Sequence, residues 1–430
     1  MDISDEFVLH IKSVWKELSI SSTGHYLHRS QNALKRSILF LTTASLATNP
    51  RLIKSYLFWA RKGHNCKIMA FRMNNWSDPL DDLLIEEHHI DVSLIAAGKE
   101  DFVFWLKASL LNRFLSYLPN SFLSKSLLAY SSTKRSWQLE RKLEEEGEIY
   151  DHIEAHNLGA LYPAYQWSAK TNASFSFDVE DFHPEEVIGF QPKKEKARRY
   201  RLMKELLPYC RTITAASPLI AKETEALLGN RLVQTINNSF FEMEFVEPED
   251  IAEEVPMKLV WFSQKISGGR GLDLILNIYQ NLGEEVSLTL IGNLDQDFYY
   301  KHLQGRRIEV LEPLPQGELH KLLSGFDVGL LLERNDVDYN RNICLTNKQF
   351  AYIQSGLYIL ATNTRAHKSF FNDYPNLASI IEQTSESLEI ELRKLIRQKQ
   401  TLRNEKRARF EYGKQFSFQR EMKKLEETQS

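Results

Sequence analysis

A glycine-rich turn between two cations is the first place where this sequence could bind an anion. It reads Gln264-Lys265-Ile266-Ser267-Gly268-Gly269-Arg270-Gly271 and joins a predicted strand, KLVWFS, to a predicted helix. Glycines allow a ligand to approach the backbone, and a helix start carries partial positive charge. With Lys265 and Arg270 on either side, the turn suits a diphosphate. It matches neither a P-loop nor a dinucleotide fingerprint, and a flexible turn with solvated cations is the alternative.

A long polar segment, 333–348, follows the next predicted strand, VGLLL, and also leads into a helix. Polar loops of this length inside a compact sheet more often have a function than serve only to connect two elements. A surface excursion is the alternative. The candidate ligand-binding residues in the two segments are Gly268, Gly269, Glu333, Asn340, Arg341, Thr346, Asn347 and Lys348.

The first half of the chain places acids and imidazoles after its predicted strands. His156 ends the strand DHIEA, and FDVEDFHPEE brings several carboxylates after the strand SFSFD. Such groups can move protons or bind metal, although turn capping and a solvated helix start are the plainer explanations. The candidates on this side are Asn49, Arg51, His156, Asp178, Glu180, Asp181 and His183, and capping alone would explain Asn49 and Arg51.

Alternating strands and helices must position these residues, and they come in two runs. The first includes SILFL, a helix that starts at Pro50 and ends just before Gly63, CKIMAF, DHIEA, SFSFD, TITAA, a helix opened by Ser217, and LVQTIN. The second includes KLVWFS, LDLILNIYQNL, VSLTLIG, IEVL, VGLLL, KQFAYIQS and YILAT. Both runs predict doubly wound parallel sheets, whose ligands bind beyond the carboxyl ends of the strands.

The domain boundaries follow from composition. Residues 242–256 contain seven acidic residues, two prolines and no Lys or Arg, as expected of a solvated linker. We therefore predict an N-terminal domain over 1–241, the linker, and a C-terminal domain over 257–409. Residues 410–430 have helical periodicity and are expected to pack back across the domain junction.

The overall composition is that of a soluble protein, with 43% hydrophobic and 26% charged residues. A net charge of -3 gives no reason to expect nucleic acid as a partner. Three scattered cysteines form neither a disulfide framework nor a zinc motif. The N-terminus predicts a short amphipathic helix, not a signal peptide. We expect a cytoplasmic protein.

Residues 102–139 have a distinct composition. They contain five Lys or Arg, eight aromatic residues and no Asp or Glu. This mixture suits anionic headgroups or a lipid-linked acceptor, and buried helices with snorkelling cations are the alternative. Peripheral contact with the inner face of the plasma membrane is the corresponding expectation.

From about Ser37 onward, the chain resembles the retaining GT-B glycosyltransferases that build bacterial surface polysaccharides (glycosyltransferase family 4-like). In the first half, the similar segments are TNPRLIKSYLFWARKGHNCKIMAF, AHNLGALYPAYQWSAK with FDVEDFHPEE, and YCRTITAASPLIAKETEALLG. The family's GR-x4-KG turn corresponds to Gln264-Lys265 and Arg270-Gly271, with the two cations exchanged. Its PNK-x-FEY-x-x-x-G segment is similar to 346–356.

Two departures stand out. Ile343 and Ala351 occupy the positions of the family's Glu-x7-Glu pair, which holds ribose hydroxyls. Contacts to the ribose and sugar must then come from elsewhere, with Glu333, Asn340 or Arg341 as candidates. In the D-x-H-E segment, Glu180 and Asp181 replace His and Glu.

The resemblance implies two Rossmann-like domains facing a central cleft and metal-independent sugar transfer, with retention, from a nucleotide-diphosphate sugar to a glycan or lipid-linked glycan. Lys265 and Arg270 would stabilise the leaving diphosphate, and His156 would orient the donor sugar. Asn49, Arg51, Asp178, Glu180 and Asp181 would line the acceptor side. Three alternatives stay open: a metal-dependent hydrolase using Asp178, Glu180, Asp181 and His183, an inactive sugar-nucleotide-binding subunit, and a nucleotide-sugar epimerase.

Overall fold

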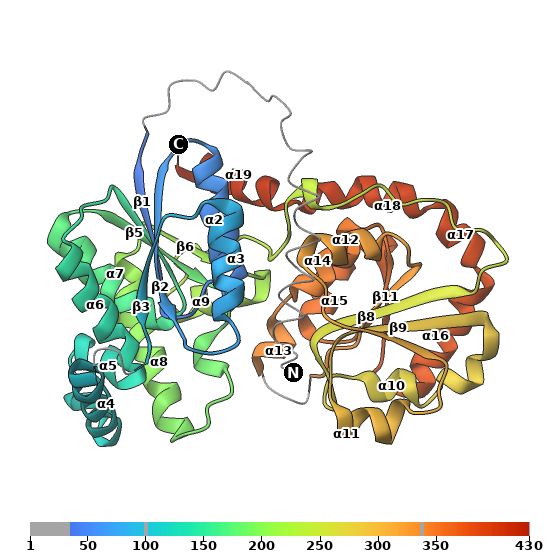
Figure 1. The fold of residues 1–430 in the computed structure, drawn as a ribbon, viewed down its shortest axis with the longest axis horizontal. Coiled ribbons are helices and arrows are strands. Elements are labelled where there is room, and N and C mark those ends of the chain that lie inside the picture. The colour runs from blue at the N-terminus through green and yellow to red at the C-terminus, as the bar shows by residue number, and fades with distance from the viewer. Residues whose placement is uncertain (1–34, 99–101, 336–338, 430) are drawn as a thin grey trace. The chain divides into compact units, whose positions relative to one another are not determined.

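The computed structural model describes residues 35–98, 102–335 and 339–429. The chain divides into a short N-terminal unit, Met1–Lys35, and a compact unit, Arg36–Ser430. The fold described below is that of the compact unit, so the expected N-terminal amphipathic helix lies outside the described residues. Within these residues the chain forms two parallel sheets, of seven and six strands, with helices between the strands (Figure 1).

The first sheet has the strand order β3-β2-β1-β4-β5-β6-β7, so the chain begins in the middle and builds outward in both directions. Its central strands are buried on both faces, as is typical of parallel sheets covered by helices. Its elements are β1 (Ser37–Thr42), α2 (Pro50–Arg61), β2 (Asn65–Arg72), α3 (Asp78–His88), β3 (Val92–Ala96), α4 (Phe102–Tyr117), α5 (Lys125–Ser132), α6 (Lys134–Glu146), β4 (His152–His156), α7 (Leu158–Thr171), β5 (Ser174–Val179), α8 (Pro192–Leu206), β6 (Thr212–Ala215), α9 (Pro218–Leu227) and β7 (Gln234–Thr235).

The second sheet repeats this pattern with the order β10-β9-β8-β11-β12-β13. Its core gathers around Trp261, which is fully buried on β8. Its elements, with those that follow it, are β8 (Met257–Ile266), α10 (Leu272–Leu276), β9 (Val286–Leu294), α11 (Gln296–Phe298), β10 (Ile308–Leu311), α12 (Gln316–Leu323), β11 (Val328–Leu331), α13 (Tyr339–Ile343), α14 (Asn347–Gln354), β12 (Tyr358–Thr362), α15 (Arg365–Asp373), β13 (Ala378–Ile381), α16 (Ser385–Arg397), α17 (Lys399–Asn404), α18 (Lys406–Gly413) and α19 (Phe418–Gln429).

Local backbone chemistry confirms the predicted start of α2. The Asn49 side chain accepts a hydrogen bond from the backbone N–H of Leu52, and Pro50 occupies the first turn. Gly63, just past the helix end, has a φ of 87°. Ser217 caps α9 in the same way through the Ile220 N–H.

Three expectations for the second half require correction. The strand β8 continues through Ile266, so Gln264 and Lys265 lie in the strand and not in the turn. The helix expected over LDLILNIYQNL ends at Leu276 and gives way to a 3-10 stretch, because asparagine at 277 and 281 and glycine at 283 disfavour α-helix. The polar segment 333–348 contains the one-turn helix α13.

The linker and the tail are both anchored. Arg403 of α17 donates to the backbone carbonyls of Ala252, Val255 and Pro256 and forms a buried ion pair with Asp327. In α19, the N–H of Phe418 donates to the Phe240 carbonyl at 2.8 Å. The apolar face of α19 packs against α2 through residues that include Phe58, Phe418 and Met422.

Among the described residues, no helix combines the length and apolar character needed to span a bilayer.

Candidate functional site

A row of polar residues crosses the first sheet at the carboxyl ends of its strands. Thr42 pairs with His156, His156 with Asp178, and Asp178 with Thr214, so the four lie side by side on β1, β4, β5 and β6. Parallel pairing aligns strand ends, and this edge is where open α/β sheets bind ligands. His156 and Asp178, which sequence reasoning chose separately, therefore belong to one cluster.

The N-terminus of α2 brings Arg51 onto this row. Its guanidinium makes a bidentate contact with Asp178, with Nε–Oδ2 at 2.5 Å and Nη2–Oδ1 at 2.9 Å, and both side chains are buried. Burial alone would raise the pKa of Asp178, but Arg51 and His156 hold it well below its usual range. Asn49 caps the helix and also donates to Thr42 at 3.2 Å, which positions this turn against β1.

His156 lies between two carboxylates. Its Nε2 is 2.9 Å from Glu154 Oε1, and its Nδ1 is 3.5 Å from Asp178 Oδ2. Burial alone would lower the pKa of His156, but these two partners raise it to about 9. The ring is therefore an imidazolium near neutral pH. Nε2 is hydrogen-bonded to Glu154, whereas Nδ1 has no hydrogen-bond partner among the described residues.

Glu180 and Asp181 follow the row on the loop after β5. Burial, and then the charges of Asp181 and Asp178, raise the pKa of Glu180 to about 7. Asp181 Oδ1 accepts a hydrogen bond from Asn340 Nδ2 at 2.6 Å, and Asn340 Oδ1 accepts from the Phe182 N–H at 2.9 Å. Asn340, predicted as a donor-site residue, thus has both ends of its amide engaged by this loop.

Two charged residues of this cluster were not anticipated. Glu154 lies two positions before His156. Alternate residues of a strand point to the same face, so this spacing could have identified Glu154 from the sequence. Lys54 lies one turn beyond Arg51 on α2 and donates to Asn238 Oδ1 at 2.7 Å and to the Ser239 carbonyl at 2.6 Å. Burial and the nearby Arg51 lower its pKa to about 7.

In the second sheet, the glycine turn has the backbone that its sequence predicts. Gly269 and Gly271 both have a φ of 74°. A Cβ at Gly271 would lie 2.0 Å from the Leu332 carbonyl oxygen, so the turn packs directly against the segment that follows β11. The two predicted donor segments are therefore neighbours at the carboxyl edge of this sheet.

The two cations of the turn have different surroundings. Arg270 Nη1 donates to Ser263 Oγ at 3.3 Å. Lys265 is 55% exposed and forms an ion pair with Asp295 at 2.7 Å. Both lie near the end of β8, where Lys265 pairs with Asn293 of β9 across a register shift.

Glu333 and Lys348 form an ion pair at 3.0 Å beside this turn. The Lys348 ammonium lies 4.9 Å from the Trp261 ring centroid. Burial alone would raise the pKa of Glu333, but Lys348 lowers it overall. The Thr346 hydroxyl is buried and has no hydrogen-bond partner among the described residues, and Asn347 is exposed at the start of α14.

The two positions that depart from the Glu-x7-Glu pattern are both buried. Ile343 packs in the core of the first sheet, and its carbonyl accepts from Ser217 Oγ at 2.8 Å. Ala351 packs in the core of the second half. Arg341 is close enough to Glu333 to help lower the pKa of that carboxyl.

The residues of the hydrolase alternative do not converge. Asp178 is paired with Arg51, Asp181 accepts from Asn340, and His183 Nδ1 contacts Glu186 at 3.0 Å. In the described part of the chain, no group of three or more His, Cys, Asp or Glu could hold a metal ion.

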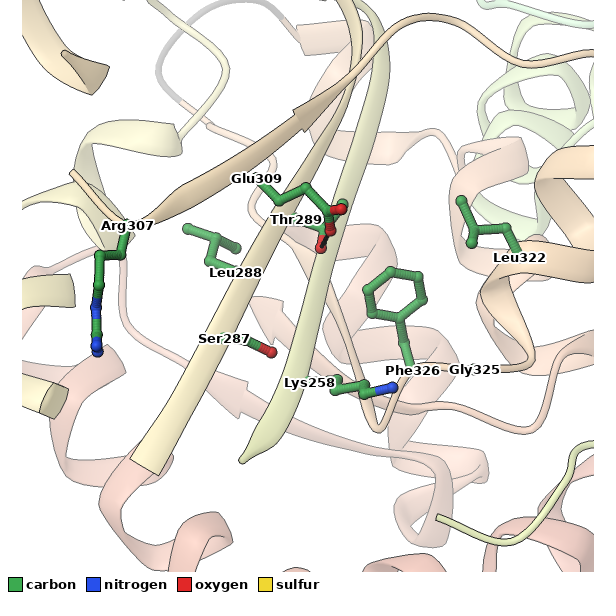
Figure 2. A pocket seen from close by; sticks show the side chains of 9 residues that line it. All are labelled: Lys258, Ser287, Leu288, Thr289, Arg307, Glu309, Leu322, Gly325 and Phe326. Atoms are coloured by element: carbon green, nitrogen blue, oxygen red, sulfur yellow. Dashed lines mark hydrogen bonds between the residues drawn. The ribbon is translucent and has the colours of Figure 1, made fainter. Parts of the chain in front are cut away.

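A hollow of about 290 Å³ opens elsewhere, at the amino ends of the second sheet's strands (Figure 2). Lys258, Ser287 and Glu309 are each the second residue of their strands. Glu309 accepts a hydrogen bond from Thr289 at 2.7 Å. Since the hollow lies at the edge opposite the glycine turn, we do not assign the donor site to it.

No protein-family model and no curated protein matches this chain. Solved structures do share its fold. *Anabaena* HepE in complex with UDP and glucose aligns with a TM-score of 0.62 at 15% identity, over 91% of this chain and 99% of HepE. Sucrose-phosphate synthase from *Thermosynechococcus elongatus* aligns with a TM-score of 0.63 at 13% identity, over 92% and 99%.

The fold is GT-B, with two Rossmann-like domains built on the two parallel sheets. The expected fold class is therefore confirmed. A *Listeria monocytogenes* structure named as a UDP-N-acetylglucosamine 2-epimerase also aligns, with a TM-score of 0.53 at 11% identity, over 88% of this chain and 91% of that one. These identities establish the shared fold only.

Proposed function

We propose that this protein is a glycosyltransferase that moves a sugar from a nucleoside-diphosphate sugar to a glycan or lipid-linked glycan acceptor, with retention of configuration. The observation that carries the proposal is the glycine turn with Arg270, packed against the segment holding Glu333 and Lys348 at the carboxyl edge of the second sheet. HepE, which has the same fold, has been solved with UDP and glucose and with UDP-glucose.

The difficult step is departure of the nucleoside diphosphate, because negative charge grows on the leaving phosphate. Arg270 would meet that charge directly. Lys265 would join it by exchanging its exposed ion pair with Asp295 for the phosphate. The start of α14 would add backbone N–H groups at Thr346, Asn347 and Lys348.

Lys348 has a different role from the one its charge alone predicts. Its ammonium is already neutralised by Glu333, so it would position that carboxylate instead of binding phosphate. Glu333, kept ionised, is a suitable acceptor for sugar or ribose hydroxyls. The leaving phosphate would take the acceptor proton, so no metal and no protein nucleophile is required.

The first-sheet cluster would serve the acceptor. Arg51 and Asp178 form a buried bidentate pair and would act as its rigid support. Glu180 would be the carboxyl that meets an acceptor hydroxyl, since Asp178 is paired with Arg51 and Asp181 accepts a hydrogen bond from Asn340. His156 would act on the sugar through Nδ1, which has no hydrogen-bond partner among the described residues.

The test combines donor binding with turnover. A thermal-shift screen against nucleotide sugars should identify the donor, because a ligand at 100 times its Kd stabilises the fold by about 2.7 kcal/mol. With that donor, Arg270→Ala should lower kcat/KM at least about tenfold, since a charge-assisted hydrogen bond contributes roughly 1.5–3 kcal/mol. Arg270→Lys should restore part of it.

Arg307→Ala is the matched control, because Arg307 is exposed and lines the hollow at the opposite edge of the sheet. It should retain parental kinetics. If Lys265→Ala and Arg270→Ala also fold and retain parental kinetics, the donor site has been assigned to the wrong place.

Two alternatives have specific observations in their favour. An inactive sugar-nucleotide-binding subunit is suggested by Ile343 and Ala351 in place of the Glu-x7-Glu pair, and donor binding without turnover against any acceptor would support it. An epimerase is suggested by the *Listeria* structure of the same fold. Product formation from the donor with no acceptor present would support that reading.

A further inference from the structure

The outer face of α4 exposes a continuous apolar stripe. Val103, Leu106, Leu110, Phe114 and Tyr117 recur at intervals of three and four residues, and all five are exposed. The Phe114 side chain, for example, is 63% exposed. The opposite face, with Ala108 and Leu115 buried, packs against α5 and α6 (Figure 1). The helix therefore has an ordered inner face and a large apolar outer face.

Neighbouring segments extend this stripe. Phe122, just beyond α4, is 79% exposed. Val187 and Phe190, on the loop before α8, are exposed as well, and the Phe190 ring contacts that of Tyr117 at 6.2 Å. We call the outer face of α4 together with Phe122, Val187 and Phe190 the α4 surface. A grouping of this size is unusual on a surface that faces only water.

The charges on α4 have one sign. Lys107 and Arg113 are exposed on the outer part of α4, and residues 102–139 contain no Asp or Glu. Lys194 of α8 donates to the Ser116 carbonyl at 2.8 Å and so brings another cation to the end of α4. The surface is thus apolar with a cationic rim.

The structure also narrows the membrane-contact region that the sequence predicted over residues 102–139. Lys134 lies 4.3 Å from the Trp105 ring centroid, Lys125 lies 4.6 Å from the Tyr209 ring centroid, and Arg135 donates to the Thr43 carbonyl. These three cations of 102–139 are engaged within the protein. Within the described part of 102–139, Lys107 and Arg113 of the α4 surface are the exposed cations that lie beside exposed apolar side chains, the combination that a lipid interface recognises.

We propose that the α4 surface docks this protein onto the headgroup interface of an anionic bilayer, with α4 lying in the plane of the membrane. Exposed aromatic and aliphatic side chains enter the interface while Lys107 and Arg113 meet anionic headgroups. A second copy of the chain is a poorer occupant, because a self-complementary contact would bring these cations together with no acid on α4 to compensate them.

The α4 surface lies close along the chain to the proposed acceptor side. Only this link to the acceptor rests on the proposed function. The exposed Val187 and Phe190 follow the segment of Asp178, Glu180 and Asp181 along the chain. Docking would therefore hold the acceptor-side loop next to the membrane to which a lipid-linked glycan is anchored.

Vesicle flotation of the full-length protein tests the proposal. Vesicles of phosphatidylcholine alone are compared with an equal mixture of phosphatidylcholine and phosphatidylglycerol. The parental protein should float with the mixed vesicles and much less with the neutral ones. Lys107→Gln with Arg113→Gln should lower the partition coefficient by more than tenfold, because each cation near the surface contributes about fivefold.

Leu110→Gln with Phe114→Gln should lower it at least about tenfold by removing apolar side chains from the interface. Ile390→Gln is the matched control, since Ile390 is 70% exposed on α16, far along the chain from α4. It should float like the parental protein. Thermal melting in each variant verifies the fold.

Equal flotation with both vesicle types, no flotation, or parental flotation of both α4 variants would overturn the proposal. Sedimentation showing a dimer that the Leu110→Gln, Phe114→Gln variant disrupts would assign the surface to a second copy instead. Flotation requires no donor, so its outcome is independent of the nucleotide-sugar screen. Membrane docking and sugar transfer can therefore fail separately.

Discussion

A His156→Gln variant tests whether the imidazolium between Glu154 and Asp178 stabilises the fold. The rise in pKa of His156 from 6.5 to about 9 corresponds to roughly 3 kcal/mol. Because the folded-state pKa is raised, this stabilisation is complete below the unfolded value and is lost as the pH rises through 9. The deficit of the variant in unfolding free energy should therefore shrink by roughly 3 kcal/mol between about pH 6 and about pH 10.

His152→Gln provides a control of opposite sign on the same strand. His152 contacts the hydroxyls of Ser174 and Ser176, and burial lowers its pKa to about 4. A lowered histidine pKa gives stability that is complete above the unfolded value and is lost as the pH falls through 4. The deficit of this variant should shrink in acid and stay constant in base.

Urea denaturation followed by tryptophan fluorescence measures both differences, since the chain contains seven tryptophans. Each variant is compared with the parental protein at the same pH, so titrations common to both proteins cancel. A His156→Gln deficit that stays constant between about pH 6 and about pH 10 would refute the imidazolium assignment. It would also return the ring to consideration as a neutral group free to meet a donor sugar.

Three further variants test other parts of the structure. Asp178→Asn should lower the unfolding free energy in urea denaturation by roughly 3–5 kcal/mol, because it leaves the Arg51 guanidinium buried without its counter-charge. Its control is Asp82→Asn, in the exposed pair with Arg72, which should cost less than about 1 kcal/mol. Gly271→Ala should lower the melting temperature, because its φ of 74° and the Leu332 carbonyl oxygen 2.0 Å from a Cβ both oppose a side chain, while Gly268→Ala, with nothing within 4 Å, should not. Glu180 has a raised pKa of about 7, so the stability it contributes is lost as the pH rises through 7. The melting temperature of Glu180→Gln should therefore rise relative to that of the parental protein between about pH 6 and about pH 8. A difference in melting temperature that stays the same over this range would contradict the assigned environment.

The sequence was most informative where backbone chemistry is local. Asn49 and Pro50 before α2, and Ser217 and Pro218 before α9, define helix starts through hydrogen bonds and fixed dihedral angles within a few residues. The strands β3 and β13 were not predicted. β3 is five residues long with every residue only partly buried, and β13 is four, so neither presents a long apolar run.

The location of the candidate site could be predicted from the sequence, but the ion pairs between its side chains could not. The rule that ligands bind beyond strand ends led to His156, Asp178 and Arg270. The parallel register then places His156 beside Asp178. Arg51 and Asp178, however, are separated by 127 residues, and no periodicity or spacing could show that they satisfy each other. The pairing of Lys348 with Glu333, which removes a cation from the expected phosphate site, was equally invisible.

Burial explains why the expected glutamate pair is missing and indicates what could replace it. Ile343 is packed in the first-sheet core and Ala351 in the second-half core, so a glutamate at either position would be a buried charge unless the local packing changed. Apolar residues at these positions are therefore required by this packing, whatever the protein does with a nucleotide sugar. Glu333 is the ionised carboxylate that remains at the same sheet edge, next to the glycine turn and held by Lys348. If the donor binds at this edge, its hydroxyls have in Glu333 an acceptor that the pattern of the Glu-x7-Glu pair does not reveal.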